Sequence, residues 1–411
     1  MGYRVDSETG PLRRVIVHRP GVEVNRLTPT NRHELLFDDV VWASRAREEH
    51  DAFTSAMTSR GIEVLDYGRL LGEALDVEEA REWAFEELLN ERTVGPSLVG
   101  PLRELGRSVD GRTLSRLWIG GILKSDLTHN VNGLLWSVLG DDEFLMTPLP
   151  NTMFTRDNSA WVYGGVTLNP MSKPARIRET IHTYVIYRWH PLFRDGWQQP
   201  DGGFDVWLGD DDPPFGPATL EGGDILVIGN RSVMVGLSER TSPQGAELLA
   251  AALFRAGVAD RVIAVRLPKQ RAFMHLDTVM TMVDRDAFVA YPGLVDAVTS
   301  YTLRPTEDGG LAVSENDTLV SALREALELD DVRILVARMN MRDAEREQWD
   351  DGNNFLALAP GVVVGYERNV RTNAMLRDNG IEVAAVAGSE LGRGRGGPRC
   401  MTCPVDRAPL P

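Results

Sequence analysis

The strongest constraint on this fold is a single order of short apolar runs that returns along the chain. In residues 159–209, two β-branched runs, a longer amphipathic stretch and a third short run follow one another. Such short runs bounded by Gly, Asn and Asp predict strands, and the longer amphipathic stretch predicts a helix. The same order returns in residues 224–268, 277–338 and 354–388, and residues 12–68 contain a strand, a helix and a strand. The sequence therefore predicts five α/β units, most of them of the order strand, strand, helix, strand.

This recurrence favours a radial or stacked repeat architecture. Each unit has an apolar face that it cannot bury alone, and neighbouring units bury it when they pack side by side. Closing the units into a ring also leaves few exposed strand edges. One ordinary mixed α/β sheet is the alternative, and periodicity alone does not separate the two.

Residues 74–140 interrupt the repeat with a pattern that is almost entirely helical. Leu and Trp recur there at helical spacing, with Asp and Ser as candidate caps. We expect a helical bundle with a Trp and Leu core and no catalytic group. The chain then divides into a catalytic α/β domain, residues 1–73 and 141–411, and an inserted bundle, residues 74–140.

Composition narrows the classes of function. The 411-residue chain is 43% hydrophobic and 25% charged, and its net charge is −16. That charge opposes binding to a phosphate backbone and is compatible with a small cationic substrate. Two cysteines cannot form a disulfide framework and fit a reducing compartment. No apolar stretch has the length of a membrane span, and the N-terminus has no signal pattern. We expect a cytoplasmic protein without nucleic-acid or membrane partners.

The segment Glu390–Asp406 contains both cysteines, Cys400 and Cys403, and three arginines among glycines. Its G-x-G-x-x-G match leaves no room for the strand-helix-strand unit of a dinucleotide site. Its C-x-x-C pair lacks the second pair of a zinc site, and the chain ends where a thioredoxin-like motif would open a helix. Three interpretations remain: an RNA-binding Arg-Gly tail, a buried inert cysteine, and a thiol nucleophile activated by nearby guanidinium groups.

Polar residues recur just before the first strand of successive units, in the stretches NTMFTRD, LEGGD, HLDT and WDDGNN. Each stretch alone is ordinary turn chemistry. In a ring, however, equivalent positions converge on the axis, which would gather Asp157, Glu221, Asp224, His275 and Asp277. Clustered carboxylates need a cationic partner, and a His beside an Asp can serve as a general acid-base. With a thiol from the C-terminus, this set suggests nucleophilic attack on a guanidinium carbon.

These stretches resemble one known family, the arginine deiminases of the guanidino-group-modifying (pentein) superfamily. The resemblance extends from end to end of the chain, and the most specific blocks are EREQWDDGNN and SELGRGRGG with CMTCP. Further matching blocks are LTPTNRHELLFDD, PLPNTMFTRD, GGVTLNPM, LEGGDILVIGN, MHLDTV and PGVVVGYERN.

The resemblance implies a five-bladed α/β propeller of ββαβ-type units with an inserted helical bundle. It also implies hydrolysis of L-arginine to L-citrulline and ammonia, without a metal or organic cofactor. We expect a homo-oligomer, a dimer or higher. Two other activities remain open: amidino transfer to an amine acceptor, and a catalytically silent protein that binds RNA.

Site residues also follow from the resemblance. Cys400 is the implied nucleophile and His275 the general acid-base, which Glu221 accompanies. Asp157 and Asp277 would bind the guanidinium group. The remaining implied residues contact the rest of the substrate: Arg176, Arg240 and Asn151 at its carboxylate, Phe154, Gly394 and the Leu36 backbone around its amine, and Arg395 as a mobile arginine near the nucleophile.

Overall fold

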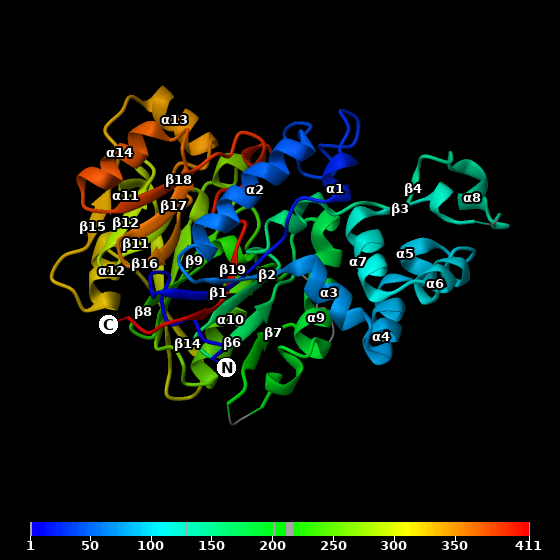
Figure 1. Cartoon of the computed structure of the whole chain (residues 1–411). Helices are drawn as coiled ribbons and strands as arrows, with labels where there is room; N and C mark the ends of the chain where they lie inside the picture. Colours follow the sequence, from blue (N-terminus) through cyan, green and yellow to red (C-terminus); the bar gives the residue numbers. More distant parts are fainter. Residues whose placement is uncertain (1, 129, 200–201, 211–216, 411) are drawn as a thin grey trace.

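The computed structural model describes residues 2–128, 130–199, 202–210 and 217–410. Among these residues, five sheets share one plan, in which an antiparallel pair of strands is followed by a third strand parallel to the second. A parallel third strand requires a crossover connection, and a helix supplies it in each unit (Figure 1). The repeat predicted from the apolar pattern is therefore present, as an α/β fold.

The five units follow one another along the chain, except that β19 of the first unit comes from the C-terminus. The strands are β19 (Cys403–Arg407), β1 (Leu12–Val17) and β2 (Glu63–Asp66); β5 (Ser159–Val162), β6 (Gly165–Leu168) and β7 (Asp205–Leu208); β8 (Ile225–Gly229), β9 (Ser232–Leu237) and β10 (Arg261–Arg266); β11 (Met280–Asp284), β12 (Ala287–Ala290) and β15 (Arg333–Leu335); and β16 (Leu356–Ala359), β17 (Val362–Tyr366) and β18 (Glu382–Val386). The crossover helices are α2 (Ala43–Thr58), α9 (Ile177–Trp189), α10 (Pro243–Arg255), α12 (Leu319–Leu327) and α14 (Val370–Asp378).

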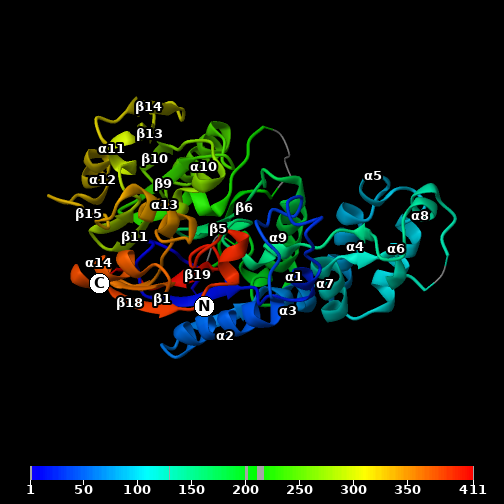
Figure 2. The same ribbon diagram turned by 90° about the horizontal axis from the view of Figure 1, so that it is seen from above.

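The first strands of successive units lie next to one another. β11 contacts both β8 and β16, and β19 contacts β5. β8 and β11 are apolar and buried along most of their length, as expected for strands covered on both faces. The helices cover the outside, where α2 packs against β2 and β18 (Figure 2). The loops that precede these inner strands are thereby brought toward one region.

Local sequence accounts for several helix boundaries. α10 begins with Pro243 in its first turn, where the missing N–H costs nothing, and the Ser242 side chain accepts a hydrogen bond from Gly245 N. α12 begins with a capping box formed by Thr318 and Ser321.

Two features differ from the sequence prediction. The first unit has a third strand, β19, which comes from the C-terminus and pairs antiparallel with β1. The sheet of the third unit is also extended beyond β10 by β13 (Ser300–Pro305) and β14 (Leu311–Glu315). The pairings of β19 with β1 and of β13 with β10 join strands that are not consecutive along the chain, so the local apolar pattern does not reveal them.

The segment between the first two units is mainly helical and lies to one side of the molecule (Figure 1). Its buried residues Leu71, Trp118 and Ile119 belong to the same hydrophobic cluster as Val162 and Ile186 of the second unit. The elements are α3 (Tyr67–Leu75), α4 (Glu78–Leu88), α5 (Glu91–Val94), α6 (Val99–Ser108), α7 (Gly111–Gly120), β3 (Ile122–Leu123), η1 (Lys124–Asp126), α8 (Leu134–Val138) and β4 (Phe144–Met146).

The remaining short elements connect or cap the units. They are α1 (Val22–Asn25), η2 (Pro150–Met153), η3 (Pro174–Arg176), η4 (Arg194–Gly196), η5 (Gly222–Asp224), η6 (Arg271–Phe273), η7 (Leu276–Thr278), α11 (Leu294–Ala297), α13 (Met341–Trp349) and η8 (Leu391–Gly394). Within the described ranges, no helix combines the length and the apolar character needed to cross a bilayer.

Candidate active site

Three 3-10 turns build one half of the site. The turns η2, η5 and η7 precede the inner strands β5, β8 and β11, so they occupy equivalent places in three successive units. Asp157 follows η2, Glu221 is the N-cap of η5, and His275 is the N-cap of η7. The recurrence of polar residues before the first strand therefore corresponds to a real structural equivalence.

His275 lies at the centre of this half. Its Nε2 is 2.7 Å from Glu221 Oε2, and its Nδ1 is 3.7 Å from Asp157 Oδ1. All three side chains are buried. Gly223 lies over the ring, and a Cβ on that residue would come within 2.6 Å of His275 Nδ1. The second glycine of LEGGD is therefore required for this close approach.

The electrostatics make His275 and Glu221 an ion pair at neutral pH. Burial alone would lower the pKa of His275, but Asp157 and the hydrogen bond with Glu221 outweigh it and raise that pKa to about 9. Burial alone would raise the pKa of Glu221, but Arg240 and His275 lower it to about 2. His275 can therefore donate a proton from the imidazolium form.

Two buried arginines balance these carboxylates. Arg176 Nη1 donates to Asp157 Oδ2 (2.6 Å), while its Nε and Nη2 bond Glu179 and its Nη2 also bonds the Asn151 and Phe154 carbonyls. Most of its donors are thus occupied. Arg240 Nη1 donates to Glu221 Oε2 (3.3 Å), and its Nε lies 3.5 Å from Glu239 Oε1. Arg240 is therefore paired with two carboxylates.

Cys400 lies in the other half, facing Asp277. The thiol is 3.7 Å from Asp277 Oδ2 and 3.9 Å from Oδ1, and the residue is 2% exposed. Burial, followed by Asp277, Asp157 and Asp351, raises the pKa of the Cys400 thiol well above its usual value. The sulfur is therefore a thiol at neutral pH, and a bound cation would favour its ionisation.

Asn354 is a site residue that the sequence prediction missed. Its Nδ2 donates to Cys400 Sγ (3.1 Å) and to the Asp277 carbonyl (3.1 Å), and its Oδ1 accepts from Arg399 N (3.0 Å) and Cys400 N (3.2 Å). This one buried amide joins the fourth unit to the thiol. The signal was its place at the end of WDDGNN, before the inner strand β16, in the position equivalent to the other polar stretches.

The residues that the resemblance places around the substrate amine, together with Asn151, have the following contacts. Gly394 packs so closely against Phe154 that a Cβ would come within 2.7 Å of its ring. Asn151 Nδ2 donates to the Leu35 carbonyl (2.7 Å), and Leu36 has a positive φ of 64° with its carbonyl bonded by Arg271 Nη2 (3.0 Å). Asn151 and Phe154 also adjoin Arg176 through their carbonyls, and a part for any of these residues in binding a substrate stays a prediction.

Arg395 lies away from the sulfur. Its guanidinium group stacks on the Trp349 ring at 3.7 Å, and Nη1 donates to the Trp349 carbonyl (2.8 Å). Nε and Nη2 are buried and make no hydrogen bond to the described residues. None of its hydrogen bonds there reaches Cys400, so a role at the nucleophile would require the side chain to move.

The two cysteines have separate surroundings. Cys403 begins β19, and its sulfur lies 3.5 Å from the Ser159 hydroxyl and carbonyl and 3.8 Å from the Tyr187 hydroxyl. Both thiols are free. A strand, and not a helix, follows the C-x-x-C pair and the G-x-G-x-x-G match. Residues 394–403 are buried, which argues against an exposed RNA-binding tail.

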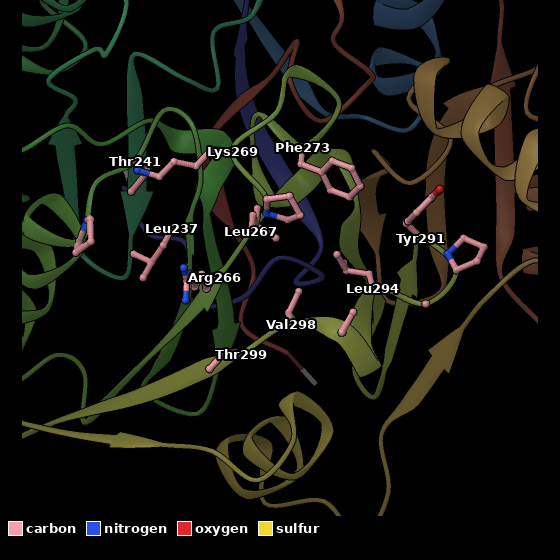
Figure 3. Close-up of a pocket in the computed structure, with 15 residues that line it drawn as sticks. Leu237, Thr241, Arg266, Leu267, Lys269, Phe273, Tyr291, Leu294, Val298 and Thr299 are labelled. Atoms are coloured by element: carbon pink, nitrogen blue, oxygen red, sulfur yellow. The ribbon is translucent and has the colours of Figure 1, made fainter.

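Two other features could hold small ligands. Asp157, Glu221 and His275 present ligand atoms within 4.8 Å of one another, a spacing that suits a metal ion. Here that cluster is already balanced by Arg176, Arg240 and the proton on His275. A cavity of about 740 Å³ lies between Thr241, Phe273 and Tyr291 (Figure 3). None of the catalytic residues predicted from the sequence lines it.

Several solved structures share this fold. The N-terminal domain of ArgZ, described as an arginine dihydrolase of the ornithine–ammonia cycle in Cyanobacteria, has 14% sequence identity and a TM-score of 0.53, covering 97% of this chain and 99% of that one. A dimethylarginine dimethylaminohydrolase from Pseudomonas aeruginosa, a cysteine-to-serine variant complexed with citrulline, has 15% identity and a TM-score of 0.51, covering 96% and 99%. A variant of AgrE complexed with L-arginine has 14% identity and a TM-score of 0.54, covering 97% of this chain and 41% of that one.

These likenesses show an α/β fold similar to that of the pentein enzymes. The family itself is shown by a sequence model described as arginine deiminase, which matches residues 33–407. That match includes every residue that the sequence analysis placed in the site. The chain belongs to the arginine deiminase family.

Proposed function

We propose that the protein hydrolyses L-arginine to L-citrulline and ammonia by covalent catalysis at Cys400. The observation that carries the proposal is the opposition of two halves: a buried thiol beside Asp277, and an imidazolium held between Asp157 and Glu221. A planar guanidinium group fits between such halves because carboxylates on both sides can accept its N–H donors.

Asp157 and Asp277 bind the guanidinium group in this proposal. Asp157 Oδ1 is buried and has no hydrogen-bond partner among the described residues, so it can accept a substrate N–H. Both oxygens of Asp277 lie within 3.9 Å of the sulfur, so the same carboxylate can hold the reacting carbon near Cys400. The positive charge of the substrate also offsets the carboxylates that keep the thiol protonated.

The first half-reaction breaks a C–N bond. The thiol releases its proton to solvent as the substrate cation binds, and the thiolate adds to the guanidinium carbon to form a tetrahedral adduct. His275 donates its Nε2 or Nδ1 proton to the departing nitrogen, which leaves as ammonia. A cationic thiouronium-type adduct on Cys400 remains, with His275 now neutral.

The second half-reaction restores the enzyme. Neutral His275 accepts a proton from a water molecule that adds to the same carbon, and the C–S bond then breaks. The product is the ureido group of citrulline, and the remaining hydroxyl proton passes to the departing sulfur, which returns to the thiol. Glu221 holds the imidazole ring in place through both steps and stabilises its charged form.

Arg240 and Arg176 read the substrate carboxylate in this proposal, with Asn151 assisting. Arg240 supports the assignment through its buried positive charge beside Glu221. Arg176 contributes its positive charge. Its Nη1 also has a second N–H, beyond the one that bonds Asp157, which can donate to the substrate carboxylate. Phe154, Gly394 and the Leu36 backbone enclose the substrate amine, and Arg395 moves from Trp349 toward the nucleophile.

The finer description of the molecule is part of the same proposal. The five sheets form a closed five-bladed propeller, residues 1–73 and 141–411 form the catalytic domain, and residues 74–140 form an inserted bundle. The protein acts in the cytoplasm as a homo-oligomer.

The test is amino-acid analysis of purified protein incubated with L-arginine and no added amine. We expect equal amounts of citrulline and ammonia. Amidino transfer would instead require an amine acceptor and release ornithine. Retention of RNA without any turnover would refute the proposed activity and favour a binding protein.

A further inference from the structure

Arg399, directly before Cys400, has a guanidinium group in the catalytic centre that the proposed reaction does not use. The residue is 1% exposed, and its Nη1 donates to Asp277 Oδ2 (2.7 Å). That carboxylate is the one beside the thiol. The other donors of Arg399 are not free: Nη2 bonds the Ile225 carbonyl (2.6 Å), and Nε and Nη2 both bond Glu8.

Glu8 comes from the N-terminal segment, far from Arg399 in sequence. Its Oε2 and Oε1 accept from Arg399 Nε (2.9 Å) and Nη2 (3.1 Å), which is the two-pronged geometry of a strong Arg–carboxylate pair. Burial alone would raise the pKa of Glu8, but Arg399 and then Arg156 lower it to about 2. Glu8 is therefore charged at neutral pH and anchors Arg399 from the side away from the thiol.

The bonds of Asp277 divide it between two partners. Both oxygens lie near Cys400 Sγ, Oδ2 at 3.7 Å and Oδ1 at 3.9 Å. Oδ2 also accepts from Arg399, whereas Oδ1 has no N–H donor in the described structure. Because Arg399 is itself a guanidinium group, Asp277 is arranged to hold a resident guanidinium on one oxygen and a second one on the other.

We propose that Arg399 and Glu8 form a positioning pair that fixes the Asp277 carboxylate, so that Oδ1 faces the substrate guanidinium group and the thiol. The N-terminal segment is then a working part of the active site. This inference deepens the proposed function and rests on it for the identity of the substrate.

A purely structural role is the rival explanation, and the choice of variants separates the two. The double substitution Glu8→Gln with Arg399→Gln keeps hydrogen-bonding groups at both positions and removes one charge of each sign, so that Asp277 is the carboxylate that loses its guanidinium partner. Arg407→Gln is the matched control, because buried Arg407 also anchors the N-terminal segment, through Gly10 O (2.7 Å), but bonds no site residue among those described. Arg399→Lys keeps the charge without the fork that bridges Glu8 and Asp277.

Two readouts test the pair. The first is kcat/KM for L-arginine, which should fall about 10- to 100-fold in the double variant, as it does when other residues that orient a catalytic group are replaced. It should remain near the unaltered value in Arg407→Gln and be intermediate in Arg399→Lys. The second is the rate at which iodoacetamide alkylates Cys400 at one pH, mapped by mass spectrometry. This rate should fall in the double variant, because Asp277 then faces the thiol without its counterion and raises the thiol pKa further.

The opposite results would overturn the inference. A structural role predicts a loosened site, with faster alkylation of Cys400 and equal losses of turnover in the double variant and Arg407→Gln. The alkylation experiment needs no substrate. If the double variant is alkylated more slowly but the native protein never forms citrulline, the positioning pair is supported and the proposed function is refuted. If the double variant turns over L-arginine at the unaltered rate, the proposed function is supported and the positioning pair is refuted.

Discussion

Replacing Asn354 with Ala should damage both stability and catalysis, because this amide makes four buried hydrogen bonds around Cys400. Asn354 is fully buried. Its loss leaves the N–H groups of Arg399 and Cys400 without their acceptor, and an orphaned buried group costs about 1–3 kcal/mol. A water molecule in the vacated space can satisfy one of them. We expect the free energy of unfolding to fall by about 2–4 kcal/mol.

The catalytic loss should exceed what stability explains. Without the Asn354 Nδ2 donor, the thiol is no longer held over Asp277, and a displacement of about 1 Å at the reacting atom can cost about 100-fold in rate. We expect kcat for L-arginine to fall by about that factor while the variant is still folded. Urea denaturation and steady-state citrulline release measure the two effects.

Asn373→Ala is the control for this experiment. Asn373 is also buried in the fifth unit, where its Nδ2 donates to the Tyr366 carbonyl (2.9 Å), but its side chain makes no bond to a site residue in the described structure. It should lose stability and keep its activity. If Asn354→Ala retains most of its kcat, or if Asn373→Ala loses activity equally, the positioning of the thiol by Asn354 is refuted.

Three further predictions follow from the site. Arg240→Leu should raise KM for L-arginine about 10- to 100-fold, which corresponds to the loss of a hydrogen bond to a charged group. The native protein should turn over agmatine, which lacks the carboxylate, poorly. Equal kcat/KM values for agmatine and arginine would show that the carboxylate is not recognised. Cys403→Ser should retain most activity without added reductant, because its sulfur contacts Ser159 and not the site carboxylates, and a citrulline assay with and without dithiothreitol checks this. The pKa of His275 is raised to about 9 from an ordinary 6.5, which means that the folded protein holds this proton more tightly than the unfolded chain does. Protonated His275 therefore contributes up to about 3 kcal/mol to the free energy of unfolding below pH 6.5, and this contribution is lost between pH 6.5 and 9. The stability difference between the native protein and His275→Asn should shrink over that window in urea titrations, and a difference independent of pH would contradict the ion pair.

The sequence revealed those parts of the molecule that are encoded locally. The units were visible because inner strands such as β8 are continuous apolar runs and the crossover helices are amphipathic. The strand β19 was not recognised, because its partner β1 lies at the other end of the chain. β13 and β14 were missed for a related reason, since they extend a sheet whose strands belong to the preceding unit.

The site divides in the same way. Asp157, Glu221 and His275 could be found because each stands before an inner strand in a repeated position. Asn354 occupies an equivalent position but was passed over, because an amide carries no charge and its role appears only from its bonds to Cys400. Glu8 had no local signal at all, since its partner Arg399 is brought to it only by the fold.

The most direct test of the central claim is mass spectrometry of the protein quenched with acid during turnover of L-arginine. The account predicts a covalent adduct whose mass equals arginine less ammonia, assigned by fragmentation to Cys400, and no adduct and no citrulline from Cys400→Ser. That variant should still bind arginine. An adduct on Cys403, or citrulline formation by Cys400→Ser, would contradict nucleophilic catalysis by Cys400.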